Sequence, residues 1–72
     1  MNLTNAIEGK EYIIKNIVTD DAELDAFLFS LGCYSDEPIT VVARKKKIYF
    51  VSIKDSRYSI DAALASAIEV FE

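Results

Sequence analysis

Short strand-like runs occupy most of this chain of 72 residues and leave few folds open to it. Five such runs, each rich in β-branched and aromatic residues and bounded by turn residues, are predicted at 11–18, 38–44, 48–53, 57–60 and 67–71. Strands so short and so few cannot form two packed layers of any size. We therefore expect them to curl into a small, partly open barrel, which also leaves few strand edges exposed.

One α-helix is predicted, over about residues 22–31. Its apolar residues recur at i, i+3, i+4 and i+7 and form one stripe: Leu24, Phe27, Leu28 and Leu31. Asp20 is expected to be the N-cap, with Glu23 three residues later completing a capping box. Gly32 then supplies the left-handed residue that commonly ends a helix.

A single helical turn near residues 61–65, begun by Asp61, is expected between the last two strands. The predicted fold class is therefore mostly β, with about five strands in an SH3-like barrel. At this length the whole chain, residues 1–72, is expected to form one domain.

The residues that most enzymes need are missing. Histidine is absent, which removes the commonest general base and the commonest transition-metal ligand. Gly9 and Gly32 alone cannot make a glycine-rich phosphate loop. Cys33 has no histidine or second cysteine to activate it, and its place after the apolar helix favours core packing over metal ligation. We expect a binding protein without a cofactor, and not an enzyme.

Acidic residues gather where the helix is predicted to begin: Asp20, Asp21, Glu23 and Asp25. Carboxylate oxygens are the ligands that Mg²⁺ and Fe²⁺ accept, so a hard-cation site is one interpretation. Capping and the helix dipole are a sufficient reason for these acids and are the favoured interpretation. Since Asp21 and Asp25 are four residues apart on the solvent face, nothing encloses an ion, and we expect no metal site.

Several features point to the cytoplasm. No run approaches the roughly 20 apolar residues that span a bilayer, so no direct membrane insertion is expected. The first residues lack the basic start and apolar run of a signal peptide. A single cysteine suits a reducing compartment. The net charge of −4 argues against nucleic acid as a partner, because lysine and arginine drive phosphate binding.

The charge is unevenly distributed along the chain. Residues 1–37 have a balance of −6 and residues 38–72 a balance of +2, with the bases concentrated at one predicted hairpin tip: Arg44, Lys45, Lys46 and Lys47. Such a tip can simply be solvated and block edge-to-edge pairing of strands. It can also dock on an acidic protein patch or on an anionic leaflet, at about 1 kcal/mol per basic residue near the surface. Both interpretations remain open.

Four landmarks in a fixed order resemble a known family. Leu3 precedes Gly9 and an isoleucine-rich strand, and a helix ends in Leu31-Gly32. A hairpin follows, and the tail carries the pattern Tyr58-Ser59-Ile60, Ala65, Ile68 and Val70. This order over about 65 residues resembles FeoA, a small protein of bacterial ferrous iron uptake. It is also similar to the SH3-like carboxy-terminal domain of iron- and manganese-dependent repressors.

The sequence departs from the family pattern at one turn. Ser35-Asp36 stand where FeoA-like chains usually have Pro-Gly. Aspartate tolerates a left-handed backbone better than most residues, so we expect the turn to survive the change. Asp61 and Leu64 also replace the basic and acidic residues that are common at these positions.

The resemblance implies an accessory protein of ferrous iron transport that binds the cytoplasmic part of FeoB, a membrane-bound GTPase-permease. The expected contact surface combines a turn with the basic tip: Tyr34, Ser35, Asp36, Glu37, Arg44, Lys45, Lys46 and Lys47. Among the tyrosines, Tyr34 is the one expected on the surface, where an SH3-type barrel can bind an extended peptide. The alternatives are a regulatory module like the repressor domain, which packs on a peptide or a DNA-binding domain, and a metal carrier.

Overall fold

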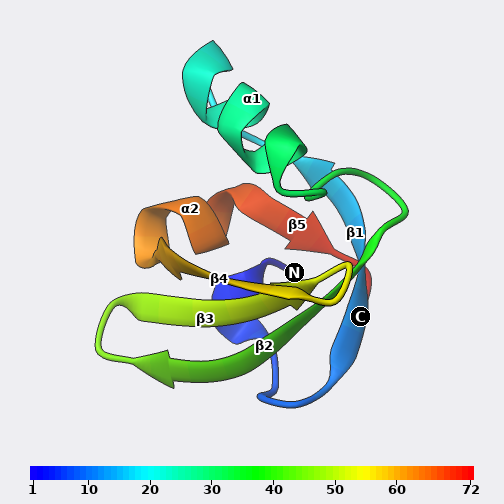
Figure 1. The fold of residues 1–72 in the computed structure, drawn as a ribbon, viewed down its shortest axis with the longest axis vertical. Coiled ribbons are helices and arrows are strands. Elements are labelled where there is room, and N and C mark those ends of the chain that lie inside the picture. The colour runs from blue at the N-terminus through cyan, green and yellow to red at the C-terminus, as the bar shows by residue number, and fades with distance from the viewer.

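The computed structural model describes residues 1–72 and contains one antiparallel sheet of five strands (Figure 1). The order of elements is η1 (Leu3–Asn5, a 3-10 turn), β1 (Glu11–Ile17), α1 (Ala22–Ser30), β2 (Pro38–Lys45), β3 (Ile48–Ile53), β4 (Ser56–Asp61), α2 (Ala62–Ala67) and β5 (Ile68–Val70). The strands lie in the order β4-β3-β2-β1-β5, and α2 connects the two edge strands. The predicted mostly-β, partly open barrel is confirmed.

The core is built by the alternation that the strands predict. On β1 Tyr12 and Ile14 are buried, and on β3 Tyr49, Val51 and Ile53 are buried while their neighbours face outward. Because successive side chains of a strand point to opposite faces, each strand gives one face to the interior. The other buried hydrophobic residues are Leu3, Ala6, Leu28, Cys33, Ile39, Val41, Ile60, Ala65, Ile68 and Val70.

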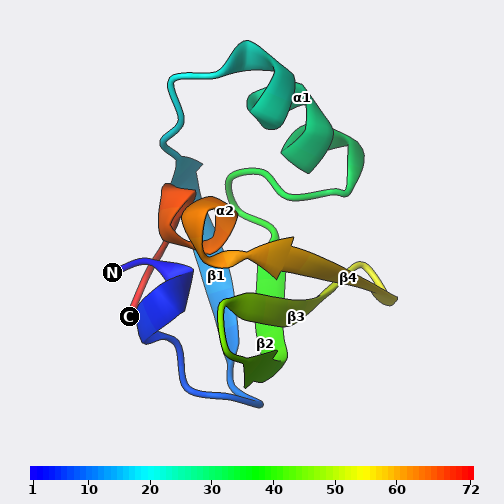
Figure 2. The same cartoon turned by 90° about the vertical axis from the view of Figure 1, so that its left-hand side faces the viewer.

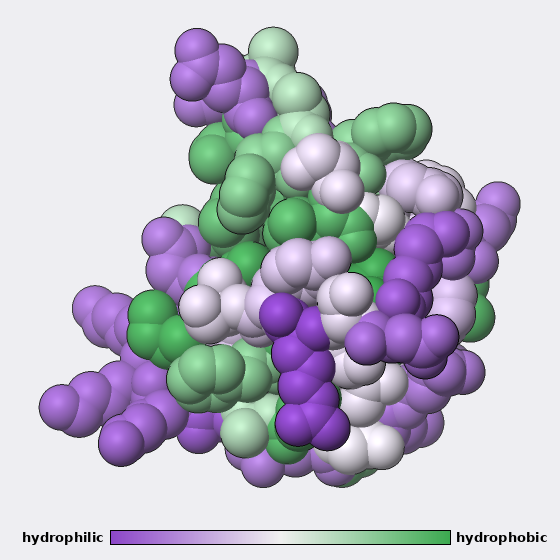
Figure 3. Space-filling view, viewed as in Figure 1, coloured by the Kyte–Doolittle hydropathy of each residue, from purple (hydrophilic) through white to green (hydrophobic).

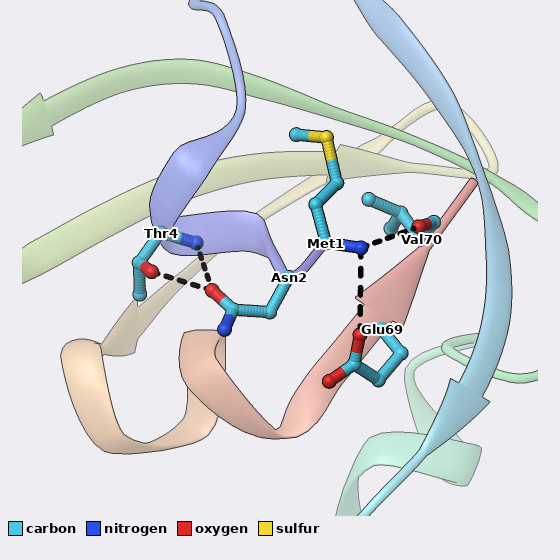
Figure 4. Close-up of polar contacts among 5 residues, drawn as sticks. All are labelled: Met1, Asn2, Thr4, Glu69 and Val70. Atoms are coloured by element: carbon cyan, nitrogen blue, oxygen red, sulfur yellow. Dashed lines mark hydrogen bonds and ion pairs between the residues drawn. The ribbon is translucent and has the colours of Figure 1, made fainter. Parts of the chain in front are cut away.

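The two ends of the chain meet beside β5 (Figure 4). The amino group of Met1 lies 3.5 Å from the carbonyl oxygen of Val70 and 3.7 Å from Oε2 of Glu69. Just after it, Asn2 caps η1, because its Oδ1 accepts a hydrogen bond of 2.9 Å from the backbone N–H of Thr4. The first residues are thereby held against the last strand.

Helix α1 stands away from the barrel, carried by the segments on either side of it (Figures 1 and 2). The predicted helix is confirmed, but its apolar stripe is not buried as a unit. Leu28 is 1% exposed, whereas Phe27 is 47% exposed and Leu24 is exposed as well. The helix ends at Ser30, and Gly32 has the expected left-handed conformation with φ +89°.

The N-cap of α1 is Asp21, so the prediction of Asp20 was wrong by one residue. Oδ1 of Asp21 accepts from the backbone N–H of Glu23 at 2.9 Å and of Leu24 at 3.4 Å. The hydroxyl of Thr19 fixes this start, because it accepts from the N–H of Asp21 at 3.2 Å. With Asp21 as N-cap, Glu23 is one residue too early to complete a capping box.

We expect Asp21→Ala to weaken α1 by about 1 kcal/mol, the usual cost of losing an N-cap side chain. Asp20→Ala removes an exposed carboxylate with no capping bond and is the matched control, with an effect within about 0.5 kcal/mol. Amide hydrogen exchange along α1 measures the difference directly. Faster exchange in the Asp20 variant than in the Asp21 variant would contradict this assignment of the cap.

Candidate partner-binding surface

The turn before β2 is held rigidly against β1. The N–H of Asp36 donates to the carbonyl of Ile14 at 2.8 Å, and the N–H of Ile14 donates to the carbonyl of Glu37 at 2.9 Å. Asp36 has φ +73°, so aspartate does adopt the left-handed backbone that the family turn usually gives to glycine. Ser35 and Asp36 are exposed, and this pair is presented to solvent by an ordered backbone.

Tyr34 belongs to a cluster that crosses from the helix end to the β3–β4 turn. It was expected on the surface but is only half-exposed, because its ring lies 4.9 Å from the ring of Phe29. Nζ of Lys54 lies 5.3 Å from the centre of the Tyr34 ring and 3.0 Å from Oε1 of Glu37. The side chains of Tyr34 and Glu37 raise the pKa of the Lys54 ammonium above its ordinary value.

A glycine at the helix end makes room for this lysine. A Cβ at Gly32 would lie 2.9 Å from Cδ of Lys54, which is closer than such atoms approach. Around these residues lies an open hollow of about 490 Å³, lined by Phe29, Ser30, Leu31, Gly32, Tyr34, Lys54 and Tyr58. We call it the turn hollow.

The basic tip divides into three free lysines and one anchored arginine. Lys45, Lys46 and Lys47 are exposed, and none of them forms an ion pair. Arg44 is partly buried, and its guanidinium donates to the carbonyl of Thr4 at 3.2 Å and to that of Ala6. Its Nε also lies 3.6 Å from Oε1 of Glu8, and its guanidinium carbon lies 5.2 Å from the centre of the Tyr49 ring.

Arg44 therefore fastens η1 and the segment after it to β2. Its charge is already shared with carbonyl groups and with Glu8, whereas the charge of the lysines is available to a partner. Of the basic residues that the sequence groups at the tip, Lys45, Lys46 and Lys47 form the accessible part.

The predicted turn and the predicted tip lie at opposite ends of β2 and are not brought together. β2 has 8 residues, and at about 3.3 Å per residue its ends are roughly 23 Å apart. What connects them is the outer face of the β2–β3–β4 sheet. On this face Phe50 and Ile48 point outward and are 41% and 40% exposed.

A second open hollow, of about 430 Å³, lies on this face and is lined by Val42, Ala43, Phe50, Arg57, Tyr58 and Ser59. It shares Tyr58 with the turn hollow, so the two hollows adjoin. Figure 3 faces this side and shows apolar surface on the sheet next to hydrophilic side chains that project at the hairpin tip. We call the two hollows together with Ile48 and the three tip lysines the sheet band. It presents apolar area edged with positive charge.

Sequence reasoning missed the middle of the sheet band. The alternation in β3 carried a usable signal, because Ile48 and Phe50 are large apolar residues at outward positions. No such signal marked Arg57 and Tyr58. They reach the band through the pairing of β3 with β4, which aligns Ser52 with Arg57, and that register is a tertiary property.

The two candidate ligand sets of the sequence have other roles. Cys33 is buried in the core, as its position favoured, and burial raises the pKa of its thiol to about 11. The acids at the start of α1 are exposed, and no three histidine, cysteine or acidic residues come together to hold a metal ion. No helix of the fold combines the length and apolar character that crossing a bilayer requires.

The chain is similar in sequence to one protein family and in fold to several solved structures. The model of the FeoA domain matches residues 1–71, and no curated protein matches the sequence at a significant level. Several solved structures share the fold, and three of them are described here. An iron uptake regulatory protein, FeoA, has a TM-score of 0.87 and 22% identity, with 97% of this chain and 93% of that chain covered.

The second is the FeoA of Stenotrophomonas maltophilia in complex with zinc, with a TM-score of 0.88 and 17% identity; the match covers 99% of this chain and 89% of that chain. It is described as an SH3-domain protein considered as an activating factor of ferrous iron transport. The third is a manganese-dependent transcriptional repressor with a TM-score of 0.88 and 22% identity. There the match covers 97% of this chain but only 40% of the repressor.

Proposed function

Since the chain belongs to the FeoA domain family, we propose that it is an accessory protein of bacterial ferrous iron transport that binds the cytoplasmic part of the FeoB-type GTPase-permease. In this role it acts in the cytoplasm as a regulator, without a cofactor and without catalysis. The description of the Stenotrophomonas maltophilia relative as a transport-activating factor supports the assignment.

The observation that carries the proposal is the sheet band. Binding surfaces of proteins combine an apolar centre with a polar rim, and aromatic residues and arginine are enriched in them. The band has this composition: Phe50, Tyr58 and Arg57 line its hollows, and unpaired lysines stand at one end. At the other end Ser35 and Asp36 are presented by the rigid turn. We assign partner binding to this surface.

Titration of the purified soluble domain of the transporter tests the proposal. We expect Lys45→Glu combined with Lys47→Glu to raise the Kd by about tenfold or more, because exposed charge pairs contribute up to about 1 kcal/mol each and reversal also adds repulsion. Lys10→Glu combined with Lys15→Glu changes the net charge equally, away from the band, and should leave the Kd within about threefold. Absence of binding by the wild type would refute the partnership itself.

A regulatory module is the second candidate, favoured by the shared fold of the manganese-dependent repressor. In that role the sheet band contacts a peptide or a DNA-binding domain. This candidate would be favoured if the wild-type chain did not bind the transporter domain but bound a helix-turn-helix protein whose gene lies next to its own. The identity of the neighbouring genes therefore decides which partner to express first.

A further inference from the structure

A second exposed apolar region lies outside the sheet band, between the start of α1 and α2. It is a groove of about 310 Å³ lined chiefly by apolar side chains, among them Val18, Leu24, Leu64 and Ala67. Val18 is 59% exposed and Leu24 is 38% exposed. Leu64 also packs against the core, but this helical groove itself has no occupant within the chain and lies outside the sheet band.

One carboxylate, that of Asp61, lines the helical groove, and three more belong to residues next to lining residues in the chain. Asp61 is among the lining residues, and Thr19, another of them, is followed directly by Asp20 and Asp21. Glu23 precedes the lining residue Leu24. All four carboxylates are exposed and none of them forms an ion pair within the chain, so a cationic partner can reach them.

The hairpin tip has the complementary properties. It is a narrow projection with three unpaired lysines, and Ile48 stands directly after them with its apolar side chain 40% exposed. The helical groove therefore combines an apolar lining with nearby carboxylates, and the tip combines an apolar side chain with three lysines. Polarity and charge are complementary.

The tip and the groove are also neighbours. Ile48 is the register partner of Asp61, which lines the groove. When two complementary patches lie side by side on one chain, a two-fold dimer can use both pairs at once. The tip of each copy then binds the groove of the other. A reciprocal contact of this kind closes at two copies and leaves no free end for further growth.

We propose that two copies of this chain associate reciprocally, with Ile48 of each copy seated in the helical groove of the other and Lys45–Lys47 facing Asp61 and the carboxylates at the start of α1. The dimer does not depend on the proposed transporter role. Because the tip lysines also belong to the sheet band, however, dimer formation and partner binding exclude each other. Self-association thus regulates how much of the protein is free to bind.

Sedimentation velocity over a range of concentrations tests the dimer with the chain alone. We expect the tip variant, Lys45→Glu with Lys47→Glu, to raise the dimer Kd by at least about tenfold, and the groove variant, Val18→Lys with Leu24→Lys, to do the same. Lys10→Glu with Lys15→Glu controls for net charge, and Ala26→Lys, at an exposed position of α1 outside all three hollows, controls for an added lysine on the helix. Both controls should dimerise like the wild type.

Mixing the two variants is the decisive step. The reversed tip of one then meets the lysine-bearing groove of the other, and the remaining tip and groove are both intact, so a one-to-one heterodimer should form. Ile48→Thr, which keeps a β-branched residue but removes the apolar anchor, should weaken the wild-type dimer independently. Raising the salt from about 0.1 M to about 1 M, which shortens the Debye length from about 10 Å to about 3 Å, should weaken it further.

Three results would overturn the dimer. These are a wild type that stays monomeric at about millimolar concentration, a dimer that neither variant weakens, and a variant mixture that stays monomeric while each variant is folded by circular dichroism. None of them bears on the transporter titration, so the two proposals fail separately.

Discussion

Leu28→Ala should release α1 from the barrel and lower the free energy of unfolding by about 2–5 kcal/mol, the usual range for truncating a buried leucine. Leu28 is the sole buried residue of the helix, at 1% exposed, and it belongs to the single core cluster. A domain of this size has a total stability of only about 4–11 kcal/mol at ordinary values per residue. The loss is therefore a large share of the total.

Urea unfolding and amide exchange together resolve how this loss is distributed. Because α1 stands away from the sheet, we expect its amides to exchange fast in the variant while those of β1 and β3 remain protected. Phe27→Ala removes a larger side chain from the preceding position, but that side chain is 47% exposed, so the free energy of unfolding should fall far less. Equal losses for the two variants would show that α1 is not held by Leu28.

Arg44→Ala is expected to lower the free energy of unfolding by about 2 kcal/mol, because hydrogen bonds from a charged donor contribute about 1.5–3 kcal/mol. The guanidinium reaches the carbonyl groups of Thr4 and Ala6, some 40 positions away in the sequence, and holds the amino-terminal segment on β2. For a domain of 60–100 residues this loss corresponds to a fall in Tm of about 10 °C.

The matched control is its neighbour in the tip. Lys45→Ala should change the Tm by no more than about 3 °C, since Lys45 is exposed and makes no ion pair. Arg44→Lys should recover little, because an ammonium cannot reproduce the two-pronged geometry of a guanidinium. If Lys45→Ala and Arg44→Ala lowered the Tm by the same amount, Arg44 would not anchor the amino-terminal segment and would be a tip residue like the lysines.

The local signals of the sequence located the elements well. The five strands and the main helix lie within one or two residues of their predicted bounds, and Asp61 caps α2 as expected, accepting from the N–H of Leu64 at 2.8 Å. The second helix is longer than the predicted turn and runs to Ala67, which shortens the last strand. Runs of alternating residues and caps are short-range properties, so a single sequence is enough to find them.

The tertiary relationships were harder to predict. The apolar stripe of α1 indicates a helix that packs fully, yet its flanking segments hold it off the barrel and leave Leu24 and Phe27 exposed. Arg44 looks equivalent to Lys45 in the sequence, and only the distant carbonyls of Thr4 and Ala6 distinguish the two. The sheet band depends on the register of β3 and β4, which no local pattern reveals.

The meeting of the two chain ends at β5 also determines how this fold can be built into larger proteins (Figure 4). Since Met1 lies against Val70 and Glu69, a host chain could enter and leave the barrel through one small area. Domains with adjacent ends can be inserted into a loop of another protein without forcing its flanking segments apart. This fold is therefore suited both to a separate chain and to insertion as a domain in a larger protein.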